Sequence, residues 1–270
     1  MVRCEVPVRD ESIQTSDRTD RISVIIPCWR DRAAAVEVAR RWANETMIHE
    51  VIVAGVVEVS PPAESPAIKF CAAPSPGRGG QMNLGASLAT GDILLFHHVD
   101  SDLSAAHLAA LRDAVRDRSV IGGAFYRKFD ERHPWMKWAE GIERWHSRTF
   151  GALYGDQSIF VRREHFDRLG GFASIPLMED VEFSLRLRRS GKIALLDPPM
   201  ASSPAKQIAQ GAWRTTLRNM LFLVLFRLGV SADLLHSRYY RARVSKRIFP
   251  ADKNADRPEQ LAPIEATSRS

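Results

Sequence analysis

Cysteine is scarce in this chain of 270 residues, and long hydrophobic runs are missing. The three cysteines, Cys4, Cys28 and Cys71, form no CxxC pair and cannot all pair with one another, which excludes a disulfide framework and favours a reduced, cytoplasmic compartment. The longest apolar run, residues 220–226, is far shorter than the roughly 20 residues of a membrane span. The first residues are charged where a secretion signal needs an apolar stretch. We therefore expect no membrane-spanning segment and no secretion.

Charge of one sign is concentrated in a single stretch. The chain carries a net charge of +6, but residues 206–247 contain nine basic residues and one acidic residue, a net +8, so the remainder sums to −2. Apolar residues make up 45% of the chain and charged residues 26%, which is typical of a soluble globular protein and excludes a fully disordered one. The basic character therefore belongs to the C-terminal region and not to the main fold.

The order of the expected elements indicates one α/β domain. Buried strands are expected at 22–27, 50–54, 67–71 and 92–96, with helices at 31–44 and 81–89 between them. This alternation is typical of a mostly parallel sheet flanked by helices. Further along the chain we expect helices at residues 105–117, 135–149 and 179–190 and an extended segment at 122–129. Residues 207–243 are expected to form one or two amphipathic helices.

These observations divide the chain into four parts. Residues 1–20 are expected to form a flexible arm, 21–205 the α/β domain, 206–249 a basic amphipathic helical extension and 250–270 a disordered tail. Ligands of such sheets bind at the carboxyl ends of the strands. The residues directly after each strand are therefore the first place to look for chemistry.

Acidic residues follow the strand at 92–96, in the sequence Phe96-His-His-Val-Asp-Ser-Asp102. Carboxylates at a strand end are well placed to hold Mg²⁺ or Mn²⁺ against phosphate oxygens, because these cations use only one or two protein carboxylates. An EF-hand is excluded, since Ala105 and Leu111 replace its required glycine and glutamate. The plainer interpretation, that these acids cap the next helix, stays open.

A glycine-rich segment, Pro76-Gly-Arg78-Gly-Gly-Gln-Met-Asn83-Leu-Gly85, leads into the second helix. Glycines let backbone N–H groups approach phosphates, and a helix N-terminus favours anions. The segment lacks the lysine of a P-loop and the spacing of a dinucleotide-binding fingerprint, so a Rossmann oxidoreductase is disfavoured. By itself it is as consistent with a structural role as with a functional one.

A third acidic segment, Pro176-Leu-Met-Glu179-Asp180-Val-Glu182, enters a helix. Acids in the first turn complement the helix dipole, and helix capping explains them without any function. A general base also needs a carboxylate held rigidly at the end of an element. The segment is therefore a second candidate for catalytic residues.

Together these motifs resemble the family 2 glycosyltransferases, which have the GT-A fold, over residues 22–199. More closely, the chain resembles the subgroup labelled arsenosugar-biosynthesis-type glycosyltransferases. The motifs that carry the resemblance are Ser-Val-Ile-Ile-Pro27, Ala-Thr-Gly-Asp-Ile-Leu-Leu-Phe96, Gly155-Asp-Gln-Ser-Ile-Phe-Val-Arg-Arg-Glu164, Leu-Gly-Gly-Phe172, Pro-Leu-Met-Glu-Asp180 and Leu185-Arg-Leu-Arg-Arg-Ser-Gly191.

The resemblance implies an inverting, metal-assisted transfer of a sugar, of hexosyltransferase type, from a nucleotide-diphosphate donor to an acceptor hydroxyl. Asp180 would be the general base, with Glu179 beside it. A divalent cation, Mn²⁺ or Mg²⁺, would lie at Asp100, with His98 and Asp102 as further candidate ligands. The remaining candidates would contact the nucleotide-sugar or the acceptor; with His98 and Asp100 they are Pro27, Arg78, Asn83, Asp156 and Gln157.

Two positions depart from the family pattern. Gly55 stands where an aspartate usually contacts the nucleotide base, and His98 stands at the first position of the usual Asp-x-Asp motif. The alternative is therefore a catalytically weak or inactive relative that binds nucleotide-sugars.

The basic extension suggests a further alternative. A basic amphipathic helix favours a membrane surface, so residues 206–247 would place the protein on the inner face of a membrane and its acceptor would be a lipid or a small molecule. A membrane-surface scaffold without enzymatic activity, and a helix that simply packs on the main domain, stay open. Nucleic-acid binding is not expected, because no recognised motif accompanies the charge.

Overall fold

The computed structural model describes residues 20–29, 32–55, 67–74, 77–99, 101–128, 140–142, 144–145, 147–149, 151–202 and 212–244. Residues 1–19, which make up most of the expected arm, and the expected tail at 250–270 lie outside the described residues. The same holds for Asp100, the main candidate metal ligand, and for the first part of the helix expected at 135–149. The described residues between 140 and 149 are helical, as expected.

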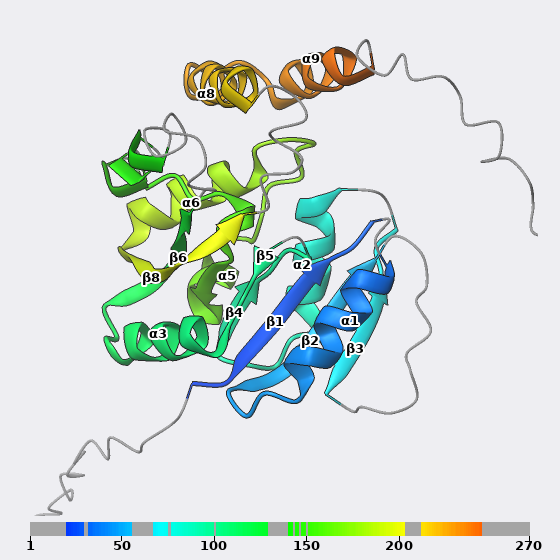
Figure 1. The fold of residues 1–270 in the computed structure, drawn as a ribbon, viewed down its shortest axis with the longest axis vertical. Coiled ribbons are helices and arrows are strands. Elements are labelled where there is room, and N and C mark those ends of the chain that lie inside the picture. The colour runs from blue at the N-terminus through cyan, green and yellow to red at the C-terminus, as the bar shows by residue number, and fades with distance from the viewer. Residues whose placement is uncertain are drawn as a thin grey trace, which may run out of the picture.

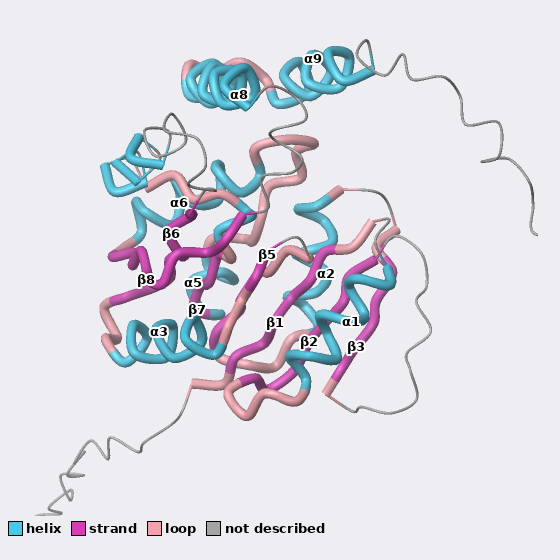
Figure 2. Tube along the Cα trace, in the orientation of Figure 1, coloured by secondary structure: helices cyan, strands magenta, loops and turns pink. Residues whose placement is uncertain are grey.

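A mixed sheet of eight strands forms the centre of the described chain, and Figures 1 and 2 show helices on both of its faces. The strand order is β3-β2-β1-β4-β7-β6-β8-β5. The first four strands in this order are parallel, β7 is antiparallel to both neighbours, β6 and β8 are parallel, and β5 is antiparallel to β8. The strands are β1 (Ile22–Pro27), β2 (Ile48–Gly55), β3 (Ile68–Ala72), β4 (Ile93–Phe96), β5 (Ser101–Asp102), β6 (Val120–Lys128), β7 (Ile159–Arg162) and β8 (Lys192–Ser202).

Successive side chains of a strand point to opposite faces of the sheet, and helices cover both faces because both are apolar. Val24 and Ile26 of β1 belong to one buried cluster, and Ile25 between them belongs to the other. The first cluster includes side chains of α1 (Arg32–Ala43) and α3 (Ala105–Arg116). The second includes side chains of α2 (Arg78–Leu88), α5 (Arg163–Arg168) and α6 (Glu179–Ser190). The α/β fold class with a mostly parallel sheet is thereby confirmed.

Several element boundaries differ from expectation. The second helix begins at Arg78 and not at Gln81, so Gly79 and Gly80 lie in its first turn, Gly77 directly precedes it and Gly85 lies further along it. Gly85 explains why this helix needs glycine, because a Cβ there would lie 2.5 Å from Ile25 Cγ2 on the sheet. The basic extension forms two helices, α8 (Ala212–Arg227) and α9 (Ala232–Val244). No helix in the described parts of the chain is long and apolar enough to cross a bilayer.

Strand β8 was not expected from the sequence, because Asp197-Pro198-Pro199 argues against a strand. The prolines lie in a break of the β6–β8 pairing, where Leu196 pairs with Phe125 and Met200 with Arg127. Three residues of β8 therefore oppose one residue of β6. Because residues 197–199 do not pair with β6 in the regular register, the prolines are not required to donate the backbone hydrogen bonds that they cannot form.

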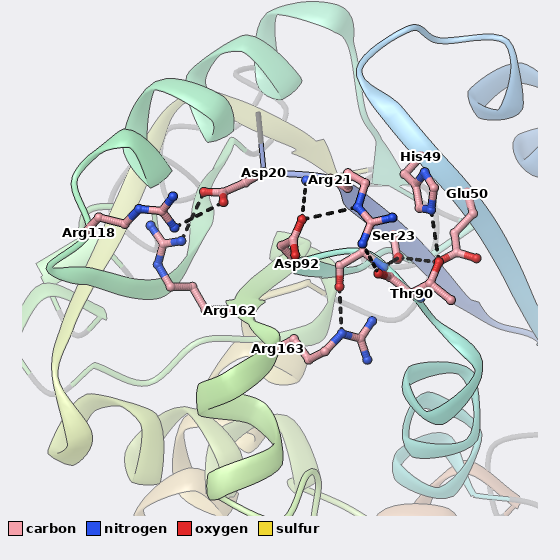
Figure 3. Close-up of polar contacts among 11 residues, drawn as sticks. Asp20, Arg21, Ser23, His49, Glu50, Thr90, Asp92, Arg118, Arg162 and Arg163 are labelled. Carbon is pink, nitrogen blue, oxygen red and sulfur yellow. Dashed lines mark hydrogen bonds and ion pairs between the residues drawn. The ribbon is translucent and has the colours of Figure 1, made fainter. Parts of the chain in front are cut away.

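A dense polar network lies at the amino ends of the parallel strands, as Figure 3 shows. Glu50 of β2 accepts hydrogen bonds from Ser23 Oγ at 2.7 Å and from Thr90 N and Oγ1 at 2.5 and 2.9 Å, and pairs with Lys69 Nζ at 2.6 Å. The neighbouring Arg162 is 4% exposed and bonds the carbonyl of Val120. The remaining members labelled in Figure 3 are Asp20, Arg21, His49, Asp92, Arg118 and Arg163.

Candidate functional site

The candidate site lies at the opposite end of the sheet, where β1 and β4 end. His97 N donates to Ile25 O at 2.9 Å, and the next donor in this parallel ladder would be the N–H of Pro27, which proline lacks. The hydrogen-bonded pairing of β1 with β4 therefore stops here, and the two strands separate. His98 is the second residue after β4, and its contact with Arg78 shows that the N-termini of α2 and α6 lie at the same end.

Arg78, the first residue of α2, connects the acidic segment to the strand end. Its Nε donates to Glu179 Oε1 and its second terminal nitrogen donates to Asp180 Oδ2 at 2.8 Å. The first terminal nitrogen lies 3.3 Å from His98 Nε2. Burial alone would lower the pKa of the guanidinium, but the charges of Asp180 and Glu179 more than offset this and raise it. Arg78 therefore stays charged and holds three predicted site residues together.

Asp180 is held by donors on both of its oxygens. Oδ2 also accepts the backbone N–H of Gly155 at 2.8 Å, and Oδ1 accepts the N–H of Val181 at 2.8 Å. The residue is 7% exposed and lies in the first turn of α6, where the helix dipole stabilises negative charge. These bonds fix the orientation of the carboxylate, as a general base requires.

Glu179 beside it is in a less favourable position. It is 3% exposed, and burial raises its pKa, with a further rise from the charge of Asp180 and a partial offset by Arg78. Two buried carboxylates thus share one guanidinium. A raised carboxyl pKa in a cluster of titratable groups is a feature of functional sites.

The start of α6 is fixed by the turn before it. Met178, the residue preceding the helix, has φ +68°, and Gly170 and Gly171 have φ +75° and +70°. Asn83 of α2 holds this turn: its Nδ2 donates to Phe172 O and its Oδ1 accepts the N–H of Phe172, both at 2.9 Å. The side chain predicted to line the nucleotide pocket thus connects α2 to the segment that carries the acids.

Asp156 lies in the short helix η1 (Gly155–Gln157), next to the amide that binds Asp180. Its Oδ2 accepts a hydrogen bond from Arg127 at the end of β6, and its backbone oxygen accepts the hydroxyl of Ser101 at 3.1 Å. Its Oδ1 is buried and has no hydrogen-bond partner. Gln157 is buried and its Oε1 caps η1 by accepting the N–H of Tyr154 at 2.9 Å.

The two histidines after β4 have different surroundings. His97 is buried, its Nδ1 lies 2.9 Å from Ser158 Oγ, and burial followed by the positive charges around it lowers its pKa to about 3. It is therefore neutral and structural. His98 is partly exposed and its Nε2 faces Arg78 and Gly155; a Cβ at Gly155 would lie 3.0 Å from this nitrogen.

The fit of a divalent cation can be judged from the donors present. Among the described residues no three His, Cys, Asp or Glu side chains form a metal cluster. Mg²⁺ and Mn²⁺ bound with a nucleotide need only one or two protein ligands. Asp156 offers one such ligand, because its Oδ1 is buried without a hydrogen-bond partner, while its backbone oxygen is held by the hydroxyl of Ser101 at 3.1 Å. The residues present fit a cation held largely by its substrate.

Asp102 points elsewhere. Side chains alternate along β5, and Ser101 is directed at η1, so Asp102 projects to the other face. There it is exposed and pairs with Arg41 of α1 at 3.5 Å. Asp102 therefore contacts α1, whereas His98 faces Arg78.

The structure thus brings Arg78, His98, Glu179 and Asp180 into one cluster, with Asp156 beside it. Pro27 ends β1, and Asn83 and Gln157 shape the turns around the cluster. Sequence reasoning missed two contributors, the backbone N–H of Gly155 and the side chain of Arg127. Arg127 was detectable as a basic residue closing a buried apolar strand, whereas nothing in the sequence marks a particular backbone amide.

Comparisons with known proteins agree on the fold. The structure is similar to that of the mannosyltransferase PcManGT from Pyrobaculum calidifontis in complex with GDP-Man and Mn²⁺, with a TM-score of 0.55 and 20% identity over 83% of this chain and 70% of that one. It is also similar to residues 1–349 of S. aureus TarS, with a TM-score of 0.51 and 12% identity over 84% and 72% of the two chains. A longer S. aureus TarS structure matches with a TM-score of 0.51 and 13% identity over 80% and 41%.

By sequence, neither a protein-family model nor a curated protein matches. At these identities the structural likeness establishes the GT-A type of fold and no particular activity. A functional assignment must therefore come from the cluster of residues around Arg78 and Asp180 in this chain.

Proposed function

We propose that this protein is an inverting glycosyltransferase that moves a sugar from a nucleotide-diphosphate donor to an acceptor hydroxyl. The observation that carries the proposal is the Asp180 carboxylate, fixed by Arg78 and the Gly155 amide at the carboxyl end of a GT-A sheet. The likeness to a mannosyltransferase with GDP-Man and Mn²⁺ supports a nucleotide-sugar donor and a divalent cation. The subgroup resemblance and membership of family 2 belong to the same proposal.

In the proposed reaction Asp180 takes the proton of the acceptor hydroxyl as that oxygen attacks the anomeric carbon. The bond from the anomeric carbon to the diphosphate breaks with its electron pair, and the nucleoside diphosphate leaves. Glu179, through Arg78, keeps the base oriented. A carboxylate general base contributes about 10²- to 10⁴-fold to such a step.

The donor would lie along the residues at this end of the sheet. Arg78 is about a third exposed, so its outer face can meet the diphosphate while its inner face holds the acids. The other proposed contacts are Pro27, Asn83, His98, Asp100, Asp156 and Gln157. Asp100, with His98 and Asp102 as further candidates, would hold the cation, which would stabilise the charge on the departing diphosphate.

An inactive, nucleotide-sugar-binding relative is the second candidate. Gly55 favours it, because this buried end of β2 has no carboxylate for a nucleotide base, and its carbonyl is engaged by Ala73 N at 2.6 Å.

The acceptor would be a small molecule or a lipid, and residues 206–247 are the part of the chain that would meet a membrane from the cytoplasmic side.

A thermal-shift titration followed by a transfer assay tests the proposal. UDP, GDP, dTDP and their sugars are each titrated with and without Mn²⁺, because a ligand bound only to the folded state raises the melting temperature. A cation-dependent rise with one nucleotide, together with release of that nucleotide from its sugar, is the expected result. A rise without any release would favour the inactive relative. If no nucleotide raises the melting temperature at millimolar concentration, the donor assignment is overturned.

A further inference from the structure

Helix α8 exposes a continuous row of apolar side chains. Its members follow the i, i+3, i+4, i+7, i+11 spacing of one helix side and are between 39 and 76% exposed; they are Leu217, Met220, Leu221, Val224 and Leu228, the last directly after the helix. At about 3.6 residues per turn this spacing places all five on one side of the helix. We name this row the outer stripe. A helix that only covers a domain carries polar residues on its outer side, so the outer stripe needs a separate explanation.

The opposite side of α8 is apolar as well, and it is already used. Leu223 is 6% exposed and forms a buried cluster with Ala152 and Val181. Phe226 packs against this cluster, together with Met178. The expected amphipathic helix is thus apolar on two sides: one side attaches it to the helix of Glu179 and Asp180, and the other faces outward. Figure 1 shows α8 and α9 in a separate layer outside the α/β domain.

Positive charge borders the outer stripe. The helical spacing places Arg227 on one side of it, where this side chain is exposed. Arg218 lies on the other side, where its guanidinium packs over the ring of Tyr239 of α9 at 4.6 Å. Residues 212–244 contain six arginines and one acidic residue, Asp233. A second copy of the chain would bring the same positive charge to this surface, whereas an anionic lipid surface complements it.

We propose that the outer stripe docks onto an anionic lipid bilayer. The apolar side chains enter the boundary between headgroups and acyl chains, and the exposed Arg227 beside them lies against the lipid phosphates. Because the inner side of α8 packs on Val181, the residue after Asp180, docking brings the candidate site to the membrane surface. The docking goes beyond the proposed transfer reaction and does not depend on it.

Co-sedimentation of the full chain with vesicles tests the proposal. The probes are phosphatidylcholine vesicles with and without phosphatidylglycerol, at low and high salt. The protein should sediment with the anionic vesicles at low salt, and the Leu221→Glu/Val224→Glu variant should bind at least about tenfold more weakly. Leu88→Glu, on α2 and 42% exposed, is the matched control and should bind like the original protein. Arg227→Gln should weaken binding to the anionic vesicles alone, and Arg116→Gln on α3 should not.

Three results would overturn the proposal. The first is failure of the original protein to sediment with anionic vesicles at low salt. The second is equal binding by the double variant, with its fold verified by circular dichroism. The third is a dimer in light scattering that the double variant converts to a monomer, which would assign the outer stripe to a second copy. If the double variant does not fold, Leu228→Ser, at the most exposed position, replaces it.

Discussion

The two ends of the sheet carry a buried glutamate each, and the two glutamates are treated in opposite ways. At the amino end, burial raises the pKa of Glu50, but Lys69, Ser23 and Thr90 together lower it to about 2. At the carboxyl end, burial raises the pKa of Glu179, and the one neighbouring guanidinium is shared with Asp180. The number of donors around each carboxylate explains the difference.

This comparison separates stability from function. The carboxylate at the amino end is more stable ionised in the fold than in water, so it contributes to folding at neutral pH. The pair at the carboxyl end leaves electrostatic strain that a bound cation or a transferred proton can relieve. Sites of this kind trade stability for activity. Substitutions at the amino end should therefore change mainly the stability of the fold, and substitutions at the carboxyl end mainly the turnover.

The largest effect is expected for Asp180→Asn. The amide preserves the shape of the side chain but cannot accept the proton of the acceptor, so turnover should fall about 10²- to 10⁴-fold. Donor affinity should change little, whereas the melting temperature should fall, because the amide nitrogen faces N–H donors that the carboxylate accepted. Steady-state transfer kinetics and donor titration measure the two quantities. Unchanged turnover would remove Asp180 from the role of base.

Arg78→Ala should have the next largest effect. Loss of charge-assisted hydrogen bonds to the acids should lower kcat/KM by about 10- to 100-fold. Without this cation the pKa of Glu179 rises further, so the pair of acids takes up a proton at higher pH. The acidic limb of the pH–rate profile should therefore move to higher pH. Arg78→Lys should restore the limb but only part of kcat, because lysine keeps the charge and lacks the planar fork.

The control for Arg78 is Arg163→Ala at the amino end. Arg163 bonds the carbonyls of Gly91 and Ala86, so its loss should lower stability and leave the pH–rate profile in place. A shift of the profile by this variant would show that the limb reports folding and not the acid pair.

Glu50→Gln should cost stability and spare turnover. The pKa of Glu50 lies at about 2 against 4.5 in the unfolded chain, which corresponds to about 3 kcal/mol at neutral pH. A lowered pKa stabilises the fold above the unfolded value, and this stabilisation is lost as the pH falls from 4.5 towards 2. Denaturant unfolding at several pH values should therefore show the difference from the original protein shrinking in that range. A constant difference would point to lost packing.

The smallest effects are expected for a pair of glycines. A Cβ at Gly91 would lie 2.5 Å from Ser23 Oγ and 2.6 Å from the backbone oxygen of Arg21, so Gly91→Ala should cost about 1 to 3 kcal/mol. At Gly155 the Cβ would meet only the ends of two flexible side chains, Arg78 and His98, both at 3.0 Å. Gly155→Ala should therefore reduce turnover a few-fold with a stability change within about 0.5 kcal/mol. Thermal unfolding and transfer assays distinguish the two patterns.

The amino-acid sequence by itself determined the α/β class, the first four strands and the helix at 179–190. Local patterns suffice there, because β-branched runs and helical spacing act within a few residues. We predict neither β7 nor β8 from the sequence: β7 is a single short run of four residues outside the alternating pattern, and β8 contains two prolines. Their place follows from partners on β4 and β6 that are distant in the chain.

The candidate site shows the same division. Residue types and strand ends pointed to the segments of Arg78, His98, Glu179 and Asp180 as separate candidates, and the family resemblance added Asp156. Only the tertiary structure joined them, since Arg78 and Asp180 are 102 positions apart and meet through the packing of α2 and α6 on one face of the sheet. It also directed Asp102 to Arg41, turned a second apolar side of α8 outward, and supplied the Gly155 amide. Such outcomes depend on which elements pack together, and side-chain chemistry along the chain does not contain that information.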